Sequence, residues 1–281
     1  MPTFDTPAAI SATVDLVVGD VRITATDRTD TVVEIRPSNA STEADVRAAE
    51  QTRVDYTDGR LTVRAPRQRG FGLFGKPGSV DVTIEVPTGS HLHGDASVAA
   101  FHGTGRLGSC RLRTAAGDIE LDRAADVDLD TSAGAVRVEH VAGRARISTG
   151  TGRIRVQEVQ GDAEVKNTNG DSWLGSVTGE ARVKAANGDI AVDRAHATVT
   201  ATTVNGDVRI GEVSAGTTTV RTQSGRLDVG VRSGTPVLLD LHTQFGRVEN
   251  HLDAYEPSGE PAGGVRVSAR TSFGDIVIRR C

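Results

Sequence analysis

A Thr-x-x-Gly motif recurs through the C-terminal two-thirds of this chain at a nearly constant interval. Its glycines are Gly117, Gly134, Gly152, Gly170, Gly188, Gly206, Gly225, Gly246 and Gly274, with spacings of 17, 18, 18, 18, 18, 19, 21 and 28 residues. A fixed period near 20 residues is typical of architectures in which identical units stack on one another. The repeat therefore constrains the fold more strongly than any local propensity does.

Each repeat unit contains two short alternations of apolar and polar residues. In the unit that begins at Gly152, Ile154 and Val156 alternate with arginines, and Ala163 and Val165 flank a glutamate. A period of two indicates half-buried strands. Because so small a unit cannot bury its apolar face alone, the units must stack. We predict an all-β, single-domain β-solenoid (β-helix) with coils of about 18 residues and two main strands per coil.

Polar residues of the motif form columns in this arrangement. The position three residues before the glycine carries Thr114, Thr131, Thr149, Thr203, Thr222, Thr243 and Thr271, with Asn167 and Ala185 in the two remaining coils. Asn169, Asn187 and Asn205 directly precede the glycine in three consecutive coils. Asn-Gly suits tight bends, and stacked Asn side chains can hydrogen-bond along a column. We interpret both columns as structural.

Composition narrows the classes of function. Hydrophobic residues make up 37% of the 281 residues but aromatic residues only 3%, so the core must consist of small and β-branched side chains. The net charge of −5 is mild and spread along the chain, which does not suggest a nucleic-acid binder, because such a protein needs a clustered basic face. Cys110 and Cys281 lie far apart, which predicts neither a disulfide framework nor a metal site.

The sequence as given contains no targeting or membrane segment. Residues 1–14 lack the basic start, the apolar stretch and the cleavage site of a secretory signal. No apolar run approaches the roughly 20 residues of a transmembrane helix. We therefore expect a cytoplasmic protein.

Two regions differ in pattern. Residues 1–88 predict a β-rich segment that caps the solenoid and contains one short helix near 43–50, preceded by a capping-box pattern from Thr42 to Asp45. Residues 89–281 carry the solenoid repeats, with a coil insertion at about 251–264 that is rich in Pro, Gly and acidic residues. The charged C-terminus is expected to close the far end of the stack.

Several segments resemble a known bacterial family. These are the strand 80–86 with Pro87, the Thr-x-x-Gly-Asp-Ile/Val repeats, and the closing run from Arg270 to Ile276. Together they are similar to the β-strand-repeat proteins described as putative adhesins, also called the toastrack domain. The resemblance covers nearly the whole chain and implies a β-solenoid without established catalysis. It also implies a link to membrane anchors and envelope-stress signalling.

One column is a weak candidate for a metal site. Asp171, Asp189 and Asp207 occupy the same position in adjacent coils, so their carboxylates are expected about 4.8 Å apart. Calcium suits such an oxygen cluster. Asp after Asn-Gly is also ordinary turn chemistry, satisfied by nearby backbone N–H groups. We favour the structural interpretation and expect no cofactor.

The loop 66–79 and a single tryptophan break the repeat and are candidates for partner contacts. The loop interleaves basic residues with apolar ones, a composition that suits a partner groove or peripheral membrane contact; its candidates are Phe71, Leu73, Phe74 and Lys76. A near match to a phosphate-binding loop fails because Pro77 stands where Ser or Thr would hold magnesium. Trp173, the only tryptophan, is predicted to face outward.

We therefore predict a non-catalytic scaffold that presents a charged face to a protein partner. Two alternatives stay open. The first is self-association into bactofilin-like rods, which requires weakly capped ends. The second is a carbohydrate-active β-helix enzyme, a polysaccharide lyase or hydrolase, with Asp171 and Asp189, or Asp122 and Asp193, as acid and base.

Overall fold

The structure is a computed structural model that describes residues 1–66, 77–252 and 264–281. It confirms an all-β solenoid fold, with one helix among the described residues. The chain divides into two compact units, Met1–His140 and Val141–Cys281. The boundary between these two units lies within the repeats.

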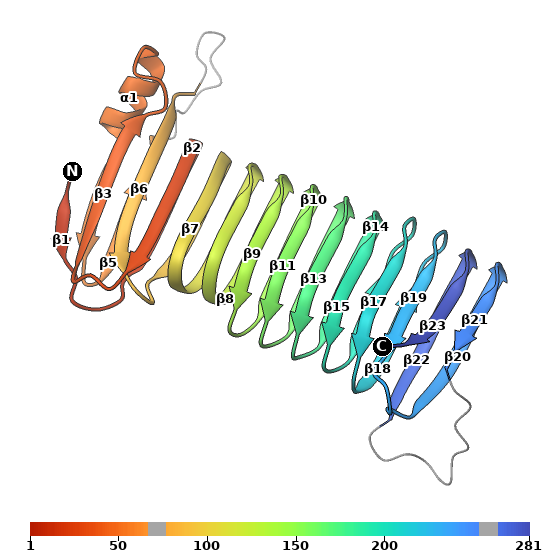
Figure 1. The fold of residues 1–281 in the computed structure, drawn as a ribbon. Helices are drawn as coiled ribbons and strands as arrows, with labels where there is room; N and C mark the ends of the chain where they lie inside the picture. The colour runs from red at the N-terminus through yellow and green to blue at the C-terminus, as the bar shows by residue number, and fades with distance from the viewer. Residues whose placement is uncertain (67–76, 253–263) are drawn as a thin grey trace. The chain divides into compact units, whose positions relative to one another are not determined.

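The first unit combines long solenoid strands with an antiparallel cap. Its elements are β1 (Thr3–Asp5), β2 (Ser11–Thr26), β3 (Asp30–Pro37), α1 (Glu43–Gln51), β4 (Arg53–Thr57), β5 (Arg60–Arg64), β6 (Ser79–Pro87), β7 (His91–Ala116) and β8 (Ile119–Ala133), with β9 (Val136–Val141) at the unit boundary (Figure 1). Strand β2 pairs in parallel with β7 along one edge, and with β5 and then β6 along the other. Antiparallel pairs β1–β3, β3–β6 and β4–β5 complete this unit. Antiparallel strands here separate the parallel stack from solvent, as solenoid ends require.

Helix α1 occurs where the sequence predicts it, but the capping-box interpretation is wrong. Thr42 is the N-cap residue, yet its side chain makes no capping hydrogen bond. The Asp45 carboxylate instead accepts a hydrogen bond of 2.8 Å from the backbone N–H of Ser79. Asp45 thereby links the helix to the start of β6 and does not serve as the capping-box residue of α1. This helix is not long or apolar enough to cross a membrane.

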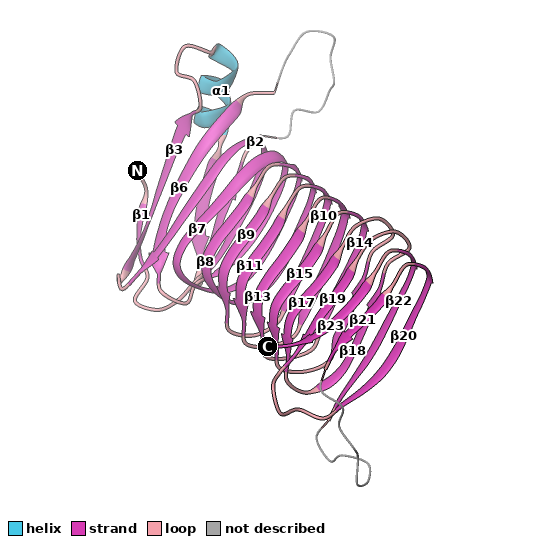
Figure 2. Cartoon of the chain, turned by 45° about the vertical axis from the view of Figure 1, so that its right-hand side comes forward, coloured by secondary structure: helices cyan, strands magenta, loops and turns pink. Residues whose placement is uncertain are grey.

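The second unit contains two layers of parallel strands. One layer consists of β10 (Ala145–Thr151), β12 (Ala163–Asn169), β14 (Ala181–Asn187), β16 (Val199–Thr202), β18 (Gly216–Arg221), β20 (Val237–Phe245) and β22 (Val265–Phe273). The other consists of β11 (Ile154–Val159), β13 (Ser172–Val177), β15 (Ile190–Ala195), β17 (Val208–Val213), β19 (Leu227–Val231), β21 (Val248–His251) and β23 (Ile276–Arg280). Each coil contributes one strand to each layer (Figure 2), which confirms two strands per coil.

In-register stacking builds the core of this unit. Ile147, Val165 and Val183 occupy one column across β10, β12 and β14, and all three are buried. Ile154 and Ile190 lie in a matching column of the other layer and are fully buried. Burying such a side chain contributes roughly 1.5–3 kcal/mol relative to leaving it exposed. The narrow interior accounts for the scarcity of aromatic residues.

The last coil of the chain is not the last coil of the stack. Strand β22 pairs with β18 on one side and with β20 on the other. Strand β23 likewise lies between β19 and β21 (Figure 1). The expectation that the charged C-terminus closes the stack is therefore wrong. Instead, the coil made by β20 and β21 lies outermost, and the C-terminal coil is inserted beneath it.

Candidate functional site

The aspartate column of the repeat is engaged in backbone hydrogen bonds. Asp171 Oδ1 accepts the N–H of Asp189 at 3.2 Å, and Asp189 Oδ1 accepts the N–H of Asp207 at 2.8 Å. Asp207 Oδ1 accepts the N–H of Arg226 at 2.7 Å in the next coil. Each carboxylate thus ties the bend of its own coil to that of its neighbour, which is the turn chemistry expected of such residues. Within the described residues, no group of three or more His, Cys, Asp or Glu side chains is arranged to hold a metal.

The asparagine and threonine columns have the same character. Asn187 Nδ2 donates to Asn169 Oδ1, and Asn205 Nδ2 donates to Asn187 Oδ1, both at 2.9 Å. Thr222 Oγ1 donates to the carbonyl of Gly206 at 3.1 Å, one coil away. These contacts hold successive coils in register and give the columns a structural role.

We expect Asp189→Ala to lower the free energy of unfolding by about 1 kcal/mol, because the N–H of Asp207 loses its acceptor. Asp189→Asn retains an acceptor oxygen and should stay within about 0.5 kcal/mol of wild type in urea denaturation. If millimolar calcium raised the melting temperature of wild type but not of Asp189→Ala, the column would be a cation site.

The loop candidates Phe71, Leu73, Phe74 and Lys76 lie outside the described residues, and their role as partner contacts stays a prediction. Two histidines of the first unit, His91 and His102, lie on β7. His91 Nδ1 accepts the backbone N–H of Ser109 at 3.0 Å. His102 lies 3.4 Å from carboxylate oxygens of both Asp20 and Glu120. These contacts satisfy the rings within the outer face of the first unit.

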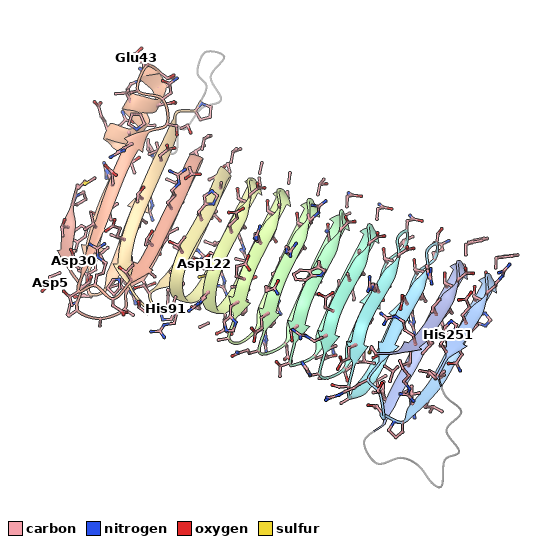
Figure 3. The ribbon with its side chains drawn as sticks, in the orientation of Figure 1. Asp5, Asp30, Glu43, His91, Asp122 and His251 are labelled. Atoms are coloured by element: carbon pink, nitrogen blue, oxygen red, sulfur yellow. The ribbon has the colours of Figure 1, made fainter. Side chains whose placement is uncertain are left out.

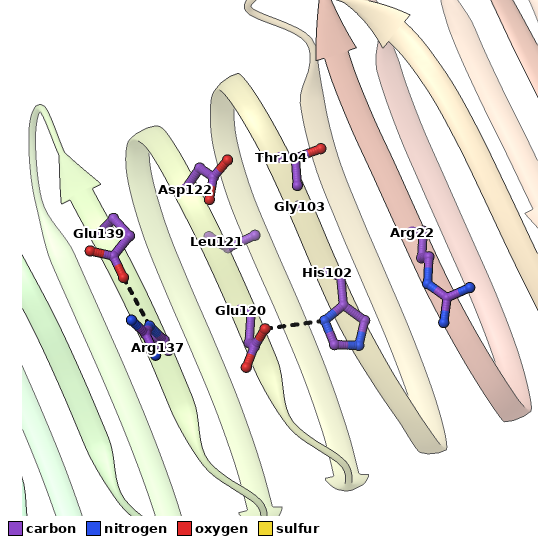
Figure 4. A pocket seen from close by; sticks show the side chains of 9 residues that line it. All are labelled: Arg22, His102, Gly103, Thr104, Glu120, Leu121, Asp122, Arg137 and Glu139. Carbon is purple, nitrogen blue, oxygen red and sulfur yellow. Dashed lines mark hydrogen bonds and ion pairs between the residues drawn. The ribbon is translucent and has the colours of Figure 1, made fainter.

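A shallow groove on the first unit gathers several of these charges (Figure 4). It has a volume of about 330 Å³, near the lower limit for ligand pockets. Arg137 pairs with Glu139 at 2.8 Å, and His102 Nδ1 lies 3.4 Å from a carboxylate oxygen of Glu120, so these polar groups already contact one another. Ligand pockets are mostly apolar with a few convergent polar groups. This groove is instead a set of paired surface charges.

Trp173 is held in a defined position on the outer face of β13. It lies beside Arg155 on β11 and Ala191 on β15. The Arg155 guanidinium carbon lies 4.3 Å from the ring centroid, within the range of a cation–π contact. Trp173 Nε1 donates to Asp193 Oδ1 at 3.3 Å. The indole is half-buried while Arg155 and Asp193 are exposed.

A glycine lets the indole lie close to the sheet. A Cβ added to Gly175 would approach Cη2 of Trp173 at 3.0 Å and would collide with the backbone carbonyl of Gln157. Gly175 is itself buried although it faces outward, two residues after Trp173. We call the group Arg155, Trp173, Gly175, Ala191 and Asp193 the Trp173 surface.

Sequence reasoning found Trp173 but not the partners that hold it. Arg155 precedes Trp173 by one 18-residue period, so the repeat could have identified this pair. The sequence predicted Asp193 only as a possible catalytic residue, paired with Asp122. In the structure Asp193 accepts from Trp173, and Asp122 lies within 3.2 Å of the N–H of Gly105. Each carboxylate has a local partner of its own.

The perturbed titratable groups do not have the character of catalytic acids. Lys166 and Arg146 lower the pKa of Glu164, which they approach to 2.7 and 3.2 Å. Arg270 lowers the pKa of Asp240. A general acid for glycoside cleavage needs the opposite shift. Burial raises the pKa of the Cys110 thiol to about 12, which leaves it protonated and unreactive at neutral pH.

Comparison with known proteins identifies the family. Residues 13–279 match the family model described as Toastrack DUF4097. No curated protein matches the chain significantly.

Solved structures that resemble the chain share little sequence with it. One is a putative cell adhesion protein from Clostridium sporogenes, at 10% identity and TM-score 0.24, with 100% of this chain and 98% of that chain covered. A second is a putative adhesin from Bacteroides fragilis, at 13% identity and TM-score 0.31, covering 99% and 96%. A third is a putative lipid binding protein from Parabacteroides distasonis, at 14% identity and TM-score 0.36, covering 98% and 95%. The family match spans nearly the whole chain, and the protein therefore belongs to the toastrack family.

Proposed function

We propose that this protein is a non-catalytic scaffold that binds a protein partner through the Trp173 surface. The observation that supports this proposal is the fixed position of Trp173 between Arg155 and Asp193. Trp and Arg are enriched among the residues that dominate protein–protein binding energy. An anchor that is already ordered before binding loses little conformational entropy when the partner docks.

The charges around Trp173 favour a protein partner over a sugar. The Arg155 guanidinium lies over the indole, whereas a sugar platform needs a free ring face. Arg155 and Asp193 supply both signs of charge in contact with the ring, and Arg209 on β17 follows Ala191 in the same register. Complementary charge at an interface sets specificity and association rate. Asp171 and Asp189 each accept a backbone N–H of the next coil, which is a structural role, so we do not favour the carbohydrate-active alternative.

Trp173→Ala should weaken partner binding by at least tenfold, since removal of an anchor of this kind commonly costs about 2 kcal/mol or more. The test is affinity capture from a lysate of the native organism, followed by titration of the captured protein against each variant. Lys184→Ala is the matched control, because Lys184 is exposed on β14 in the other layer.

Equal loss of binding in both variants, or none in Trp173→Ala, would contradict the proposal. The chain supplies its own reporter, because Trp173 is its only tryptophan. Docking over the indole should shift its fluorescence emission to shorter wavelength. The family resemblance points to adhesion or envelope-stress signalling as the process served, and the identity of the captured partner separates the two.

A further inference from the structure

In the described part of the chain, strand β20 has one edge without a neighbouring strand. Among the described residues, β22 is the one strand that pairs with it. Val265 N–H donates to the carbonyl of Pro236 at 2.8 Å. This hydrogen bond shows which residues of β20 direct their backbone groups toward β22. Successive residues of a parallel strand direct their backbone groups alternately to its two edges. The N–H and C=O groups of Leu239, Leu241 and Thr243 therefore point away from β22. A row of such groups is ready to pair with another strand.

No described coil covers the core at this end either. Leu239 and Leu241 of β20 are half-buried, whereas their register partners on β22, Val267 and Ala269, are fully buried. In the other layer, Val248 is 46% exposed, although its partner Ile276 on β23 is fully buried. Leu239, Leu241 and Val248 are thus apolar and occupy interior positions, but no described coil covers their outer side.

The outward side chains of β20 are complementary to a second copy of the same strand. Asp240 and His242 stand on either side of Leu241, and an antiparallel pair centred on Leu241 would place each Asp240 opposite the other copy's His242. The open backbone groups allow this register, because Leu241 would face its counterpart as a hydrogen-bonded pair. Arg270 Nη2 donates to Asp240 at 2.9 Å and holds the carboxylate in place on the outer face.

Strand β21 repeats the pattern in the second layer. Glu249 and His251 flank Asn250 (His251 is labelled in Figure 3). The Ile276 N–H donates to the carbonyl of Arg247 at 2.9 Å, so Asn250 directs its backbone groups to the open edge. Leu241 lies five residues before Gly246 and Asn250 lies four residues after it. One two-fold axis can therefore pass through both residues and pair both strands at once.

We propose that two copies of this protein associate edge to edge through β20 and β21, related by a two-fold axis through Leu241 and Asn250. Each copy then supplies the coil that the other lacks. The reciprocal contacts are Asp240 with His242 and Glu249 with His251, each formed twice. Because a two-fold interface uses the same patch on both copies, association stops at the dimer.

The test is sedimentation velocity over a concentration series from about 1 to 200 µM. Wild type should move from a monomer to a species of twice the 29.4 kDa chain mass. His242→Glu should raise the dimer dissociation constant by about tenfold or more, because two Asp–Glu pairs replace two Asp–His pairs. Adding Asp240→Lys to His242→Glu should restore the dimer, since Lys and Glu carry opposite charges and would face each other across the axis. Circular dichroism of each variant is the control for folding.

Leu241→Pro separates strand pairing from simple charge attraction. The Leu241 N–H points away from β22, so proline at this edge position leaves the β20–β22 ladder intact and blocks the central pair of the dimer. This variant should remain monomeric at 200 µM. A wild-type chain that stays monomeric to 200 µM, a failure of the double variant to recover the dimer, or growth beyond the dimer would each overturn the proposal.

Discussion

Replacing Gly188 with alanine is expected to lower the free energy of unfolding by about 3 kcal/mol. Gly188 has a φ of +138°, a conformation that L side chains rarely adopt. An added Cβ would also lie far inside contact distance of the Gly170 carbonyl oxygen in the preceding coil. The alanine therefore has two unfavourable effects. It strains the local backbone, and it forces apart two coils that are hydrogen-bonded on both sides of the bend.

Gly234→Ala is the control for the first of these costs. Gly234 has a φ of +78°, but nothing lies within 4 Å of the position its Cβ would occupy. This variant carries the strain alone, and we expect a loss of about 1 kcal/mol. Urea denaturation of both variants measures the difference. Equal losses would mean that close approach of the coils does not require the repeat glycine.

Removing residues 265–281 deletes the inserted coil, which consists of β22 and β23. It should also leave β20 and β21 of the outermost coil without their neighbouring strands. Strands β22 and β23 provide the described pairing partners of β20 and β21. They also bury Val265, Val267 and Ile276 between the two neighbouring coils. We expect hydrogen exchange at β20 and β21 to accelerate by at least about 100-fold, whereas β11, β13 and β15 keep their protection.

This result depends on the order of the coils in space. If the coils stacked in chain order, the deletion would remove only the end of the stack, and β20 would remain paired with β18. Retained protection in β20 would therefore contradict the inserted position of β22. The control is a variant with Cys281 alone removed, which leaves both strands of the inserted coil complete.

The repeat allowed most of the fold to be predicted, but not the order of its last two coils. Thr243 and Thr271 open the same motif in the coils of β20 and β22, so the motif carries no information about which coil lies outside. Thr271 Oγ1 donates to Gly225 at 3.3 Å, and Thr243 Oγ1 donates to Gly274 at 2.9 Å, so the threonine column continues through the exchanged coils. The longer spacings after Gly225 were the one local indication that the order of the coils changes there.

Asn167 shows a second limit of pattern reasoning. It occupies a threonine position, and its Nδ2 lies 3.0 and 2.8 Å from the carbonyls of Gly152 and Gly170. The longer side chain fits because Ala185 follows it in the column and Ser172 lies beside it, 3.3 Å from Nδ2. Compensation between neighbouring coils depends on side-chain volume in three dimensions, which a one-dimensional pattern of apolar and polar residues does not encode.

The candidate site was predictable only in part. A lone tryptophan at an outward position is visible in the sequence, and Arg155 stands one period before it. The contact with Asp193 depends on the rotamer of the indole and on the absence of a side chain at Gly175. Neither follows from strand periodicity, so the fixed position of Trp173 emerged only from the structure.

Site-specific photo-crosslinking beside Trp173 tests the central claim most directly. Ala191 neighbours Trp173 in the register of β13 and β15, so it can carry a photoreactive amino acid next to the indole. Irradiation in the native organism should give one discrete protein adduct, which disappears when Trp173→Ala is added and persists with Lys184→Ala. An adduct unaffected by Trp173→Ala, or no protein adduct at all, would contradict the proposal that this surface binds a protein partner.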